Sequence, residues 1–212
     1  MELPRPRPRA RPGHYDRSQS RRERRQQQRR RIVEAAAEVF ANKGYANSNV
    51  EDVLRQAGIS RVTFYAHFKN IEDLLLAVHE HASRQSHRAI EGRIERVGDP
   101  VARLEAAIRA YLEMLRDHAD LARVVNREIL AAGPQHLKLR DENTARSAAL
   151  LNQGVAEAYG AGLITRPPDE MTAYALACAI EGLGMRFIDR GEADRIFDAV
   201  PKLVELVVRA FR

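Results

Sequence analysis

Apolar residues recur at helical spacing along almost the whole chain. In the first clear segment, from about Arg24 to Asn42, they fall at positions i, i+3, i+4, i+7 and i+8, which places them on one helix face. These positions are Ile32, Ala35, Ala36, Val39 and Phe40. No stretch alternates polar and apolar residues for long enough to predict a β-strand. The pattern therefore predicts an all-α protein.

Capping signals divide the next segment into two very short helices and one long helix. Gly44 is expected to end the first helix, and Ser48-Asn49-Val50-Glu51 has the form of a capping box that opens the second. Gly58 is expected to end the second helix, and Ser60 to cap a third that runs to about His67. A long fourth helix is predicted from Asn70 to about Glu91.

Five more helices are predicted after a break at Gly98. Asp99-Pro100 reads as the start of the fifth, and Gly133-Pro134 separates the sixth, at about 120–132, from the seventh, which ends at 160–162. The eighth is expected at about 170–190 and the ninth at about 192–211. Pro201 either kinks the ninth helix or marks its true start, because proline removes one backbone hydrogen bond.

The last two helices carry apolar residues on two faces rather than one. One face can serve the core of the chain, and the other could close a four-helix bundle with a second copy, with Gly182 and Gly184 allowing close approach. The alternative is a larger monomeric core. The residues predicted at the dimer interface are Ile180, Gly184, Phe187, Val200, Leu203 and Val207.

Between Val50 and Phe68 the two short helices follow the plan of a helix-turn-helix, with the turn at Gly58-Ile59-Ser60. The second of them is small enough to enter a DNA major groove. Ile59, Phe64 and Phe68 are expected to anchor it in the core, so that Arg61, Val62 and Tyr65 face outward. Arginine can read guanine and valine can touch a thymine methyl group, whereas Thr63, Tyr65 and Lys69 can reach phosphates. The predicted DNA-binding residues are Ser48, Asn49, Ser60, Arg61, Val62, Thr63, Tyr65, His67 and Lys69.

The segment from about residue 26 to 88 closely resembles the N-terminal domain of the tetracycline-repressor (TetR) family. The resemblance is carried by Ile32-Val33-Glu34-Ala35-Ala36, Phe40, Gly44-Tyr45, Ala57-Gly58-Ile59-Ser60 and Thr63-Phe64-Tyr65-Ala66-His67-Phe68. It implies that the third helix lies in the groove and that Arg61, Val62, Thr63 and Tyr65 contact DNA. The family often has lysine where this chain has Ile71, and Lys69 is expected to replace that phosphate contact.

The middle helices combine apolar side chains with a few polar atoms, the mixture typical of a small-molecule pocket. An ordinary core would look the same, but the resemblance implies an effector pocket, with an apolar or aromatic effector. The residues predicted to line it are Tyr111, Met114, Leu115, His118, Arg127, Tyr159, Tyr174 and Cys178.

Charge is unevenly distributed along the chain. Residues 1–31 carry 12 arginines against three acidic residues, so the net charge of this segment is +9, although that of the whole chain is only +6. Residues 1–23 are predicted to form an unfolded Arg/Pro-rich arm, which is either solvated or in contact with DNA. The predicted helix-turn-helix domain spans residues 24–88, and a helical effector-binding and dimerisation domain spans residues 89–212.

Other kinds of site find little support. Cys178 is the single cysteine and cannot form an intramolecular disulfide, and no apolar run long enough to cross a bilayer is expected, so a cytoplasmic location without membrane contact is predicted. His79 and His81 point about 200° apart on a helix and cannot share an ion. No metal, cofactor or catalytic constellation is predicted, which disfavours an enzyme.

Together these features predict a ligand-responsive transcriptional regulator, expected to be a repressor, that binds a near-palindromic operator in double-stranded DNA as a homodimer. The alternative is a constitutive or architectural DNA-binding protein without an effector.

Overall fold

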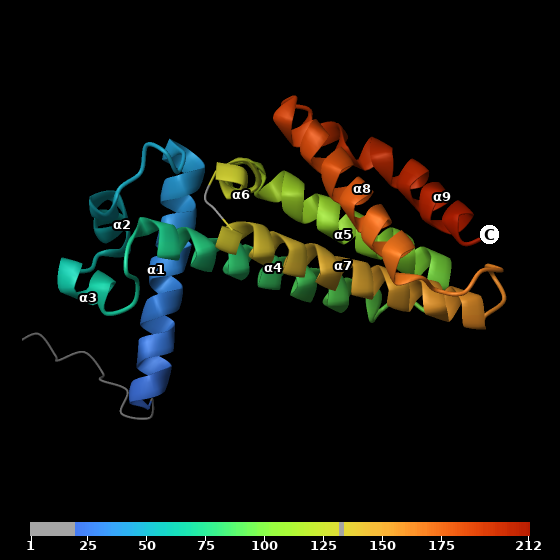
Figure 1. Cartoon of the computed structure of the whole chain (residues 1–212), viewed down its shortest axis with the longest axis horizontal. Coiled ribbons are helices and arrows are strands. Elements are labelled where there is room, and N and C mark those ends of the chain that lie inside the picture. Colours follow the sequence, from blue (N-terminus) through green and yellow to red (C-terminus); the bar gives the residue numbers. More distant parts are fainter. Residues whose placement is uncertain (1–19, 132–133) are drawn as a thin grey trace, which may run out of the picture.

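The computed structural model describes residues 20–131 and 134–212, with the backbone alone at 127–131. In the described part of the chain every regular element is helical, as predicted (Figure 1). The elements are α1 (Arg21–Lys43), α2 (Val50–Ala57), α3 (Arg61–Tyr65), α4 (Ile71–Ile94), α5 (Pro100–Asp117), α6 (Ala119–Ala131), α7 (Pro134–Gly160), α8 (Glu170–Asp189), the 3₁₀ helix η1 (Ala193–Ala199) and α9 (Val200–Ala210).

Helix α1 starts three residues earlier than predicted, within the segment expected to be unfolded. Ser20 caps it: the Ser20 hydroxyl accepts from the backbone N–H of Glu23, and the Glu23 carboxylate accepts from the backbone N–H of Ser20. This reciprocal pair satisfies two free donors and stabilises the helix start despite the neighbouring arginines. Residues 1–19, which hold the rest of the predicted arm, lie outside the described residues.

Pro201 stands at the start of α9, directly after η1, so it marks the true start of the last helix rather than a kink. A proline in the first turn costs little because the N–H groups there have no partner within the helix.

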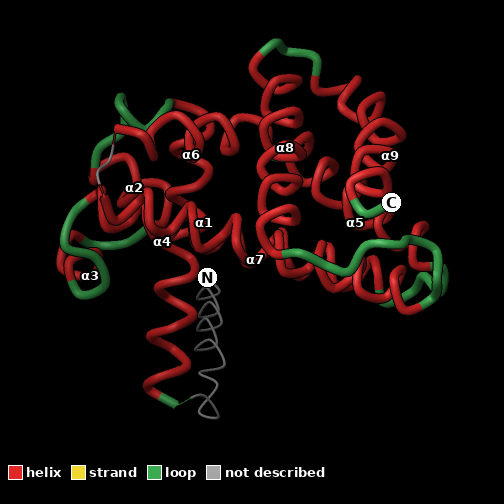
Figure 2. Tube along the Cα trace, turned by 45° about the vertical axis from the view of Figure 1, so that its right-hand side comes forward, coloured by secondary structure: helices red, strands yellow, loops and turns green. Residues whose placement is uncertain are grey.

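The N-terminal helices share one apolar core. Phe40 of α1, Val53 of α2, Phe64 of α3 and Leu74 of α4 are fully buried in it, and Phe68 lies beside them. Figure 2 shows α2 and α3 together on one side of the long α1 and α4 helices. This core fixes α3 on the outside of the molecule.

Helices α5 to α9 enclose a second, larger core. Leu112 of α5, Ile188 of α8 and Ile196 of η1 are fully buried there. Gly184 lies where α8 crosses α5: a Cβ atom at this position would stand 2.7 Å from Leu115 Cδ1 and 3.0 Å from Leu112 Cδ2. Glycine therefore permits the close approach of α8 to α5.

Two helices join the two cores. Helix α4 runs from the first core into the second part, so the predicted boundary at residue 88 falls within a continuous helix. Leu121 and Val124 of α6 pack against the N-terminal core. The two parts are thus attached at two places.

Helix α8 is the one described helix that is long and apolar enough, by composition, to cross a membrane, although no such run was expected from the sequence. One of its faces packs in the chain's own core, where Ala173, Leu176 and Ile188 are buried. Its apolar character is accounted for in part by this packing.

Candidate DNA-binding surface and effector cavity

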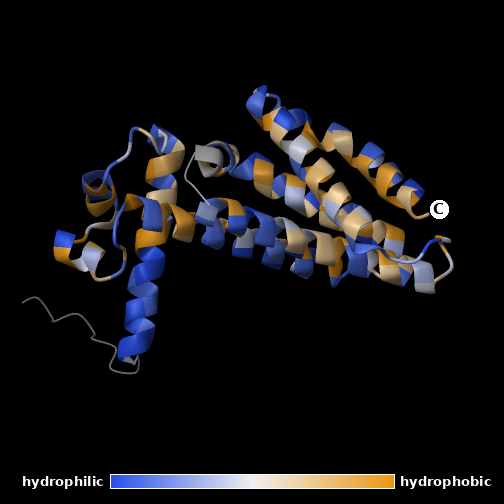
Figure 3. Cartoon of the chain, viewed as in Figure 1, coloured by the Kyte–Doolittle hydropathy of each residue, from blue (hydrophilic) through white to orange (hydrophobic). Residues whose placement is uncertain are grey.

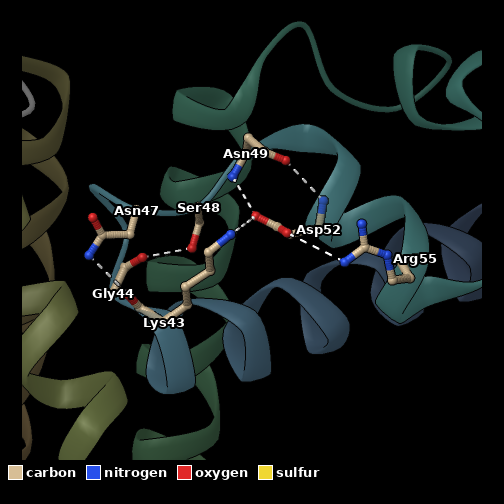
Figure 4. Close-up of polar contacts among 7 residues, drawn as sticks. All are labelled: Lys43, Gly44, Asn47, Ser48, Asn49, Asp52 and Arg55. Carbon is tan, nitrogen blue, oxygen red and sulfur yellow. Dashed lines mark hydrogen bonds and ion pairs between the residues drawn. The ribbon is translucent and has the colours of Figure 1, made fainter.

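Helix α2 begins with a capping box, one residue later than predicted. Asn49, not Ser48, is the N-cap, and its partner is Asp52, not Glu51: the side chain of each accepts from the backbone N–H of the other, at 3.1 Å (Figure 4). The Ser48 hydroxyl donates instead to the Gly44 carbonyl, at 2.6 Å. Ser48 thus completes the turn after α1, and Asn49 is left to cap α2.

The Lys43 ammonium also donates a hydrogen bond to the Asp52 carboxylate at 2.6 Å, and this ion pair links the end of α1 to the start of α2 (Figure 4). The hydrogen bond from Lys43 and that from the Asn49 backbone hold the pKa of Asp52 below its usual value. Asp52 is therefore ionised at neutral pH, and α2 is fixed to α1 by charge as well as by its apolar face.

The turn and cap before α3 form as the sequence predicted. Gly58 adopts φ +64°, in the left-handed region that favours glycine, and the Ser60 hydroxyl accepts from the Thr63 N–H at 3.2 Å. Helix α3 ends at Tyr65, two residues before the predicted His67. Phe64 is fully buried and Phe68 nearly so, and the two rings contact each other, which anchors this short helix.

The outward face of α3 presents the side chains expected to meet DNA. Val62 is 81% exposed and Tyr65 52% exposed, and their spacing of three residues places them on the same face of α3. Arg61 and Lys69 are exposed beside them. The Arg61 guanidinium is ion paired with the carboxylate of Glu51, which lies on α2.

Other predicted DNA-binding residues are engaged within the protein. The Thr63 hydroxyl lies 3.0 Å from that of Ser60, and His67 Nε2 lies 2.9 Å from Gln28 Oε1 on α1. Burial and the charges of Arg25 and Arg29 lower the pKa of His67. We call α2, α3 and the segment that follows to Lys69 the reading head. Thr63 and His67 hold its shape, whereas Arg61, Val62, Tyr65 and Lys69 form its outer surface.

A cavity of about 790 Å³ lies where the two parts of the molecule meet. Helices α1 and α4 to α8 all contribute to its wall, so a molecule bound in the cavity would contact the N-terminal part directly. Four residues predicted to line a pocket do so: Tyr111, Met114, Leu115 and His118. The volume falls within the range of small-molecule sites.

Three of the other four predicted pocket residues are not placed there. Tyr159 is 44% exposed and Cys178 is exposed. The Tyr174 hydroxyl donates to the Asp141 carboxylate at 2.7 Å, which raises the pKa of Tyr174 to about 12, and Tyr174 does not line the cavity. The side chain of Arg127 lies outside the described residues. Sequence periodicity places residues on a helix face but does not say which face meets the cavity.

The cavity wall contains polar residues that were not predicted from the sequence. From α4 and α7 they include His79, Ser83, His87, Asn143, Thr144 and Ser147, and the charged residues Arg103, Arg140, Glu157 and Glu181 also line the cavity. The sequence indicates these residues only by placing polar side chains among the apolar residues of two amphipathic helices. For His79, the sequence raised only the question of metal binding. No group of three or more potential metal ligands is present among the residues that the structure describes.

His79 and Asn143 form a polar spot in this wall. Asn143 Nδ2 lies 3.2 Å from His79 Nε2, whereas His79 Nδ1 and Asn143 Oδ1 are buried without a hydrogen-bond partner. Burial, helped by His136 and Arg140, lowers the pKa of His79 to about 4, so the imidazole is neutral at pH 7. With Nε2 accepting from the amide, Nδ1 carries the proton. His79 Nδ1 and Asn143 Oδ1 are both buried, and they leave one donor and one acceptor without a partner.

The predicted dimer residues lie mostly inside the chain, and this prediction is corrected. Ile180, Gly184, Val200, Leu203 and Val207 are buried in the second core, and Phe187 is half-buried against it. The reason is that this stripe of α8 packs on α5 and that of α9 packs beside it. The other stripe of α8 is exposed, and its members are Met171, Ala175, Cys178, Ala179 and Gly182.

Two family models match this chain. Residues 32–78 match the model described as bacterial regulatory proteins of the tetR family, and residues 97–204 match the tetracyclin repressor-like C-terminal domain. The second match alone covers about half of the chain.

Individual relatives are regulators from bacteria. A fatty acid metabolism regulator protein of Bacillus subtilis is 32% identical over 98 residues, which cover 46% of this chain and 50% of that protein. The regulator EthR of Mycolicibacterium smegmatis is 26% identical over 208 residues, covering 95% of this chain and 86% of EthR. The chain thus matches only about half the length of the first of these two.

Solved structures share the fold over nearly the whole chain. The regulator FadR of Bacillus subtilis, solved with stearoyl-CoA, superposes with a TM-score of 0.74 at 23% identity and covers 86% of this chain and 99% of FadR. A tetR-family regulatory protein from Rhodococcus RHA1 gives 0.66 at 25% identity, covering 87% and 96%. Both have the same arrangement of helices as the chain described here.

Proposed function

Because the chain belongs to the tetracycline-repressor (TetR) family, we propose that it is a ligand-responsive transcriptional repressor that binds a near-palindromic operator as a homodimer. The single observation that carries the ligand response is the cavity whose wall is shared by α1 and α4 of the N-terminal part and by α5 to α8. A cytoplasmic location follows from this role, since the operator is chromosomal DNA. No enzymatic activity is proposed.

In the DNA complex, α3 enters the major groove and its outward residues meet the bases. Arg61 supplies paired donors for a guanine, Val62 contacts a thymine methyl group, and Tyr65 and Lys69 contact phosphates. The exposure of Val62 and Tyr65 supports this assignment, because an apolar side chain is stabilised by contact with a groove and not by contact with water. Ser48, Asn49, Ser60, Thr63 and His67 are also proposed to contact DNA, while their caps and hydrogen bonds hold α2 and α3 in place.

The dimer is proposed to form through the exposed stripe of α8, from Met171 to Gly182, together with the exposed part of α9 around Leu206. Met171 is 78% exposed and Leu206 44% exposed. Small side chains at Ala175, Ala179 and Gly182 let a second copy of α8 approach closely. A two-fold axis through these helices places two copies of α3 on one side of the dimer, as a palindromic site requires.

The effector is proposed to be a largely apolar or aromatic molecule with one polar end that accepts hydrogen bonds. Apolar wall residues such as Ile90, Ile108 and Leu151 bind the apolar part. The polar end accepts from His79 Nδ1–H, a buried donor that lacks a partner. The B. subtilis relative is a fatty acid metabolism regulator, so fatty acids and their thioesters are the first compounds to test.

Ligand binding is transmitted to DNA by α4. Filling the cavity shifts α4 relative to α5 and α7, and the first core moves with α4 because Leu74 and Val78 are buried in it. The spacing of the two α3 helices in the dimer then no longer fits successive major grooves. A coupling free energy of roughly 1 to 3 kcal/mol would weaken operator binding by about 5-fold to 150-fold.

The test begins with duplexes selected from a random library by binding to the full chain, followed by fluorescence anisotropy with a series of fatty acids and acyl-CoA thioesters. A repressor of this kind selects a near-palindrome and loses affinity when one compound is added. Ala107→Trp should fill the cavity and abolish the response, whereas the control Ala149→Trp, on the exposed side of α7, should leave it unchanged.

Two outcomes would contradict the proposal in different ways. Failure to select any preferred duplex would remove the role in transcription. Selection of a palindrome whose binding responds to none of a broad set of apolar compounds, and is the same in the Ala107→Trp variant, would favour a constitutive DNA-binding protein.

A further inference from the structure

The first three turns of α1 are strongly basic and project from the folded part. Between Arg21 and Arg31 the helix has seven arginines and one acidic residue, Glu23, whose carboxylate is used in the helix cap. Figure 3 shows this end of α1 as a continuous hydrophilic segment that extends beyond the first core. Positive charge at this density is unfavourable within one helix, so a partner of opposite charge would stabilise it.

This basic segment lies directly beside the reading head. Arg25 Nη2 donates to the Ala66 carbonyl, at the end of α3, at 3.1 Å, and the Arg29 guanidinium lies 4.8 Å from the centre of the Phe68 ring. Gln28 holds His67 from the same side. With a rise of about 1.5 Å per residue, Arg21 stands about 6 Å beyond Arg25 along the helix axis. The segment is therefore continuous with the outer surface of α3.

Four arginines share one side of this segment. At about 100° per residue, Arg21, Arg24, Arg25 and Arg31 fall within roughly 120° of one another around α1, on the side that includes the Arg25 contact with α3. We call them the α1 arginine stripe. Arg30, which lies on the opposite side, is ion paired with Glu34 at 2.8 Å.

We propose that the α1 arginine stripe is a second DNA-binding surface, which holds the phosphates that flank the major groove occupied by α3. The inference rests on the proposed role of α3 in DNA binding. Its partner is duplex DNA, because the stripe continues a surface that faces DNA and because guanidinium groups pair well with phosphate oxygens. Contacts of this kind add affinity for any sequence and extend the bound site outward from each half-site.

The test compares the triple variant Arg21→Gln, Arg24→Gln and Arg31→Gln with the unmodified chain. Arg25 is left intact because it supports the end of α3. A matched control, Arg88→Gln, Arg146→Gln and Arg166→Gln, removes three exposed arginines from α4, α7 and the loop before α8. Both sets lower the net charge of each chain equally. Affinity is measured against salt concentration, on the selected duplex and on a scrambled duplex of the same composition.

The stripe variant should bind both duplexes more weakly by a similar factor and keep the ratio between them. Its log-log salt slope should fall by about 0.9 for each phosphate that the variant no longer neutralises, or roughly 5 for three phosphates in each half of a dimer. Hydroxyl-radical footprinting should show weaker protection only at the outer edges of the site. The control variant should retain the salt slope and the footprint of the unmodified chain.

The outcomes separate this inference from the proposed function. If the unmodified chain selects a duplex but the stripe variant has its full salt slope and footprint, the stripe is a solvated helix face and the inference is wrong. Equal losses of affinity in the stripe and control variants would also overturn it, since only net charge would matter. Binding of the stripe to anionic phospholipid vesicles, with unchanged DNA affinity in the variant, would assign it to a membrane surface instead.

Discussion

Arg61, the first residue of α3, and Glu51, in the first turn of α2, form an ion pair across the turn that joins the two helices. Both side chains are largely exposed, so the pair contributes at most about 1 kcal/mol to stability. Its effect is on availability: the guanidinium expected to read a base is held by a carboxylate until DNA replaces it. In the proposed DNA complex, Arg61 would exchange Glu51 for a base.

The Arg61→Ala variant should bind the selected duplex more weakly by about 1 to 3 kcal/mol and discriminate less between bases at one position of each half-site. Fluorescence anisotropy with single-base variants of the duplex measures both effects. Glu51→Gln is the counterpart, because it frees Arg61 and removes an acidic group near DNA; we expect binding up to about 5-fold tighter. Unchanged base preference in Arg61→Ala would exclude Arg61 as a base reader.

Gly184→Ala should lower the free energy of unfolding by about 1 to 2 kcal/mol. The new Cβ would overlap Leu112 and Leu115, which are too deeply buried to move aside, and overpacking of this kind costs about 1 to 3 kcal/mol. Gly92→Ala, in the exposed part of α4 with no atom within 4 Å of the new Cβ, should raise stability by about 0.5 to 1 kcal/mol. Urea denaturation at one fixed protein concentration compares the two; equal effects would contradict the close packing at Gly184.

Ala179→Arg should convert the dimer to a monomer, because it places a charged side chain in the middle of the exposed stripe of α8. Sedimentation velocity at micromolar concentration reports the change, and circular dichroism should show that the helices are retained. Ala145→Arg, on an exposed position of α7, is the control and should remain dimeric. A dimeric Ala179→Arg variant would place the interface elsewhere.

Stability should fall as pH decreases from about 6.5 to about 4, and His79 should contribute to this loss. The pKa of His79 is lowered to about 4 in the folded chain, so in this range the unfolded chain binds a proton that the folded chain does not. A single such site gives a slope of about 1.4 kcal/mol per pH unit. Urea denaturation between pH 7 and pH 4.5 should show a smaller slope for His79→Gln.

Part of the slope should remain in that variant, because burial also lowers the pKa values of His67, His81 and His136. An identical pH dependence in the His79→Gln variant would show that His79 is charged or solvated in the folded chain.

Local signals made the reading head predictable. The turn at Gly58, the Ser60 cap and the anchors Phe64 and Phe68 act within a few residues of one another, so their chemistry can be read directly from the sequence. The start of α1 was predicted three residues too late. The dense run of arginines favoured an unfolded arm, but the local cap formed by Ser20 and Glu23 starts the helix there.

Features that depend on distant neighbours could not be predicted in the same way. Both stripes of α8 are apolar, so the sequence does not say which one faces inward. In the structure, the stripe that contains Gly184 packs on α5. The same is true of the cavity: His79 and Asn143 are 64 positions apart, and nothing in either helix alone indicates that they meet. Helix positions follow from local spacing, whereas the partners of each face follow from the whole fold.

Leu121 and Val124 of α6 complete the apolar core that holds α3, although they belong to the C-terminal part of the chain. Removing that part would strip a side of the core, so residues 20–94 alone should be less stable than in the intact chain. Heat should therefore melt both parts in a single cooperative transition. A compound bound in the cavity would then raise the melting temperature of the DNA-reading helices themselves, even while it lowers their affinity for DNA.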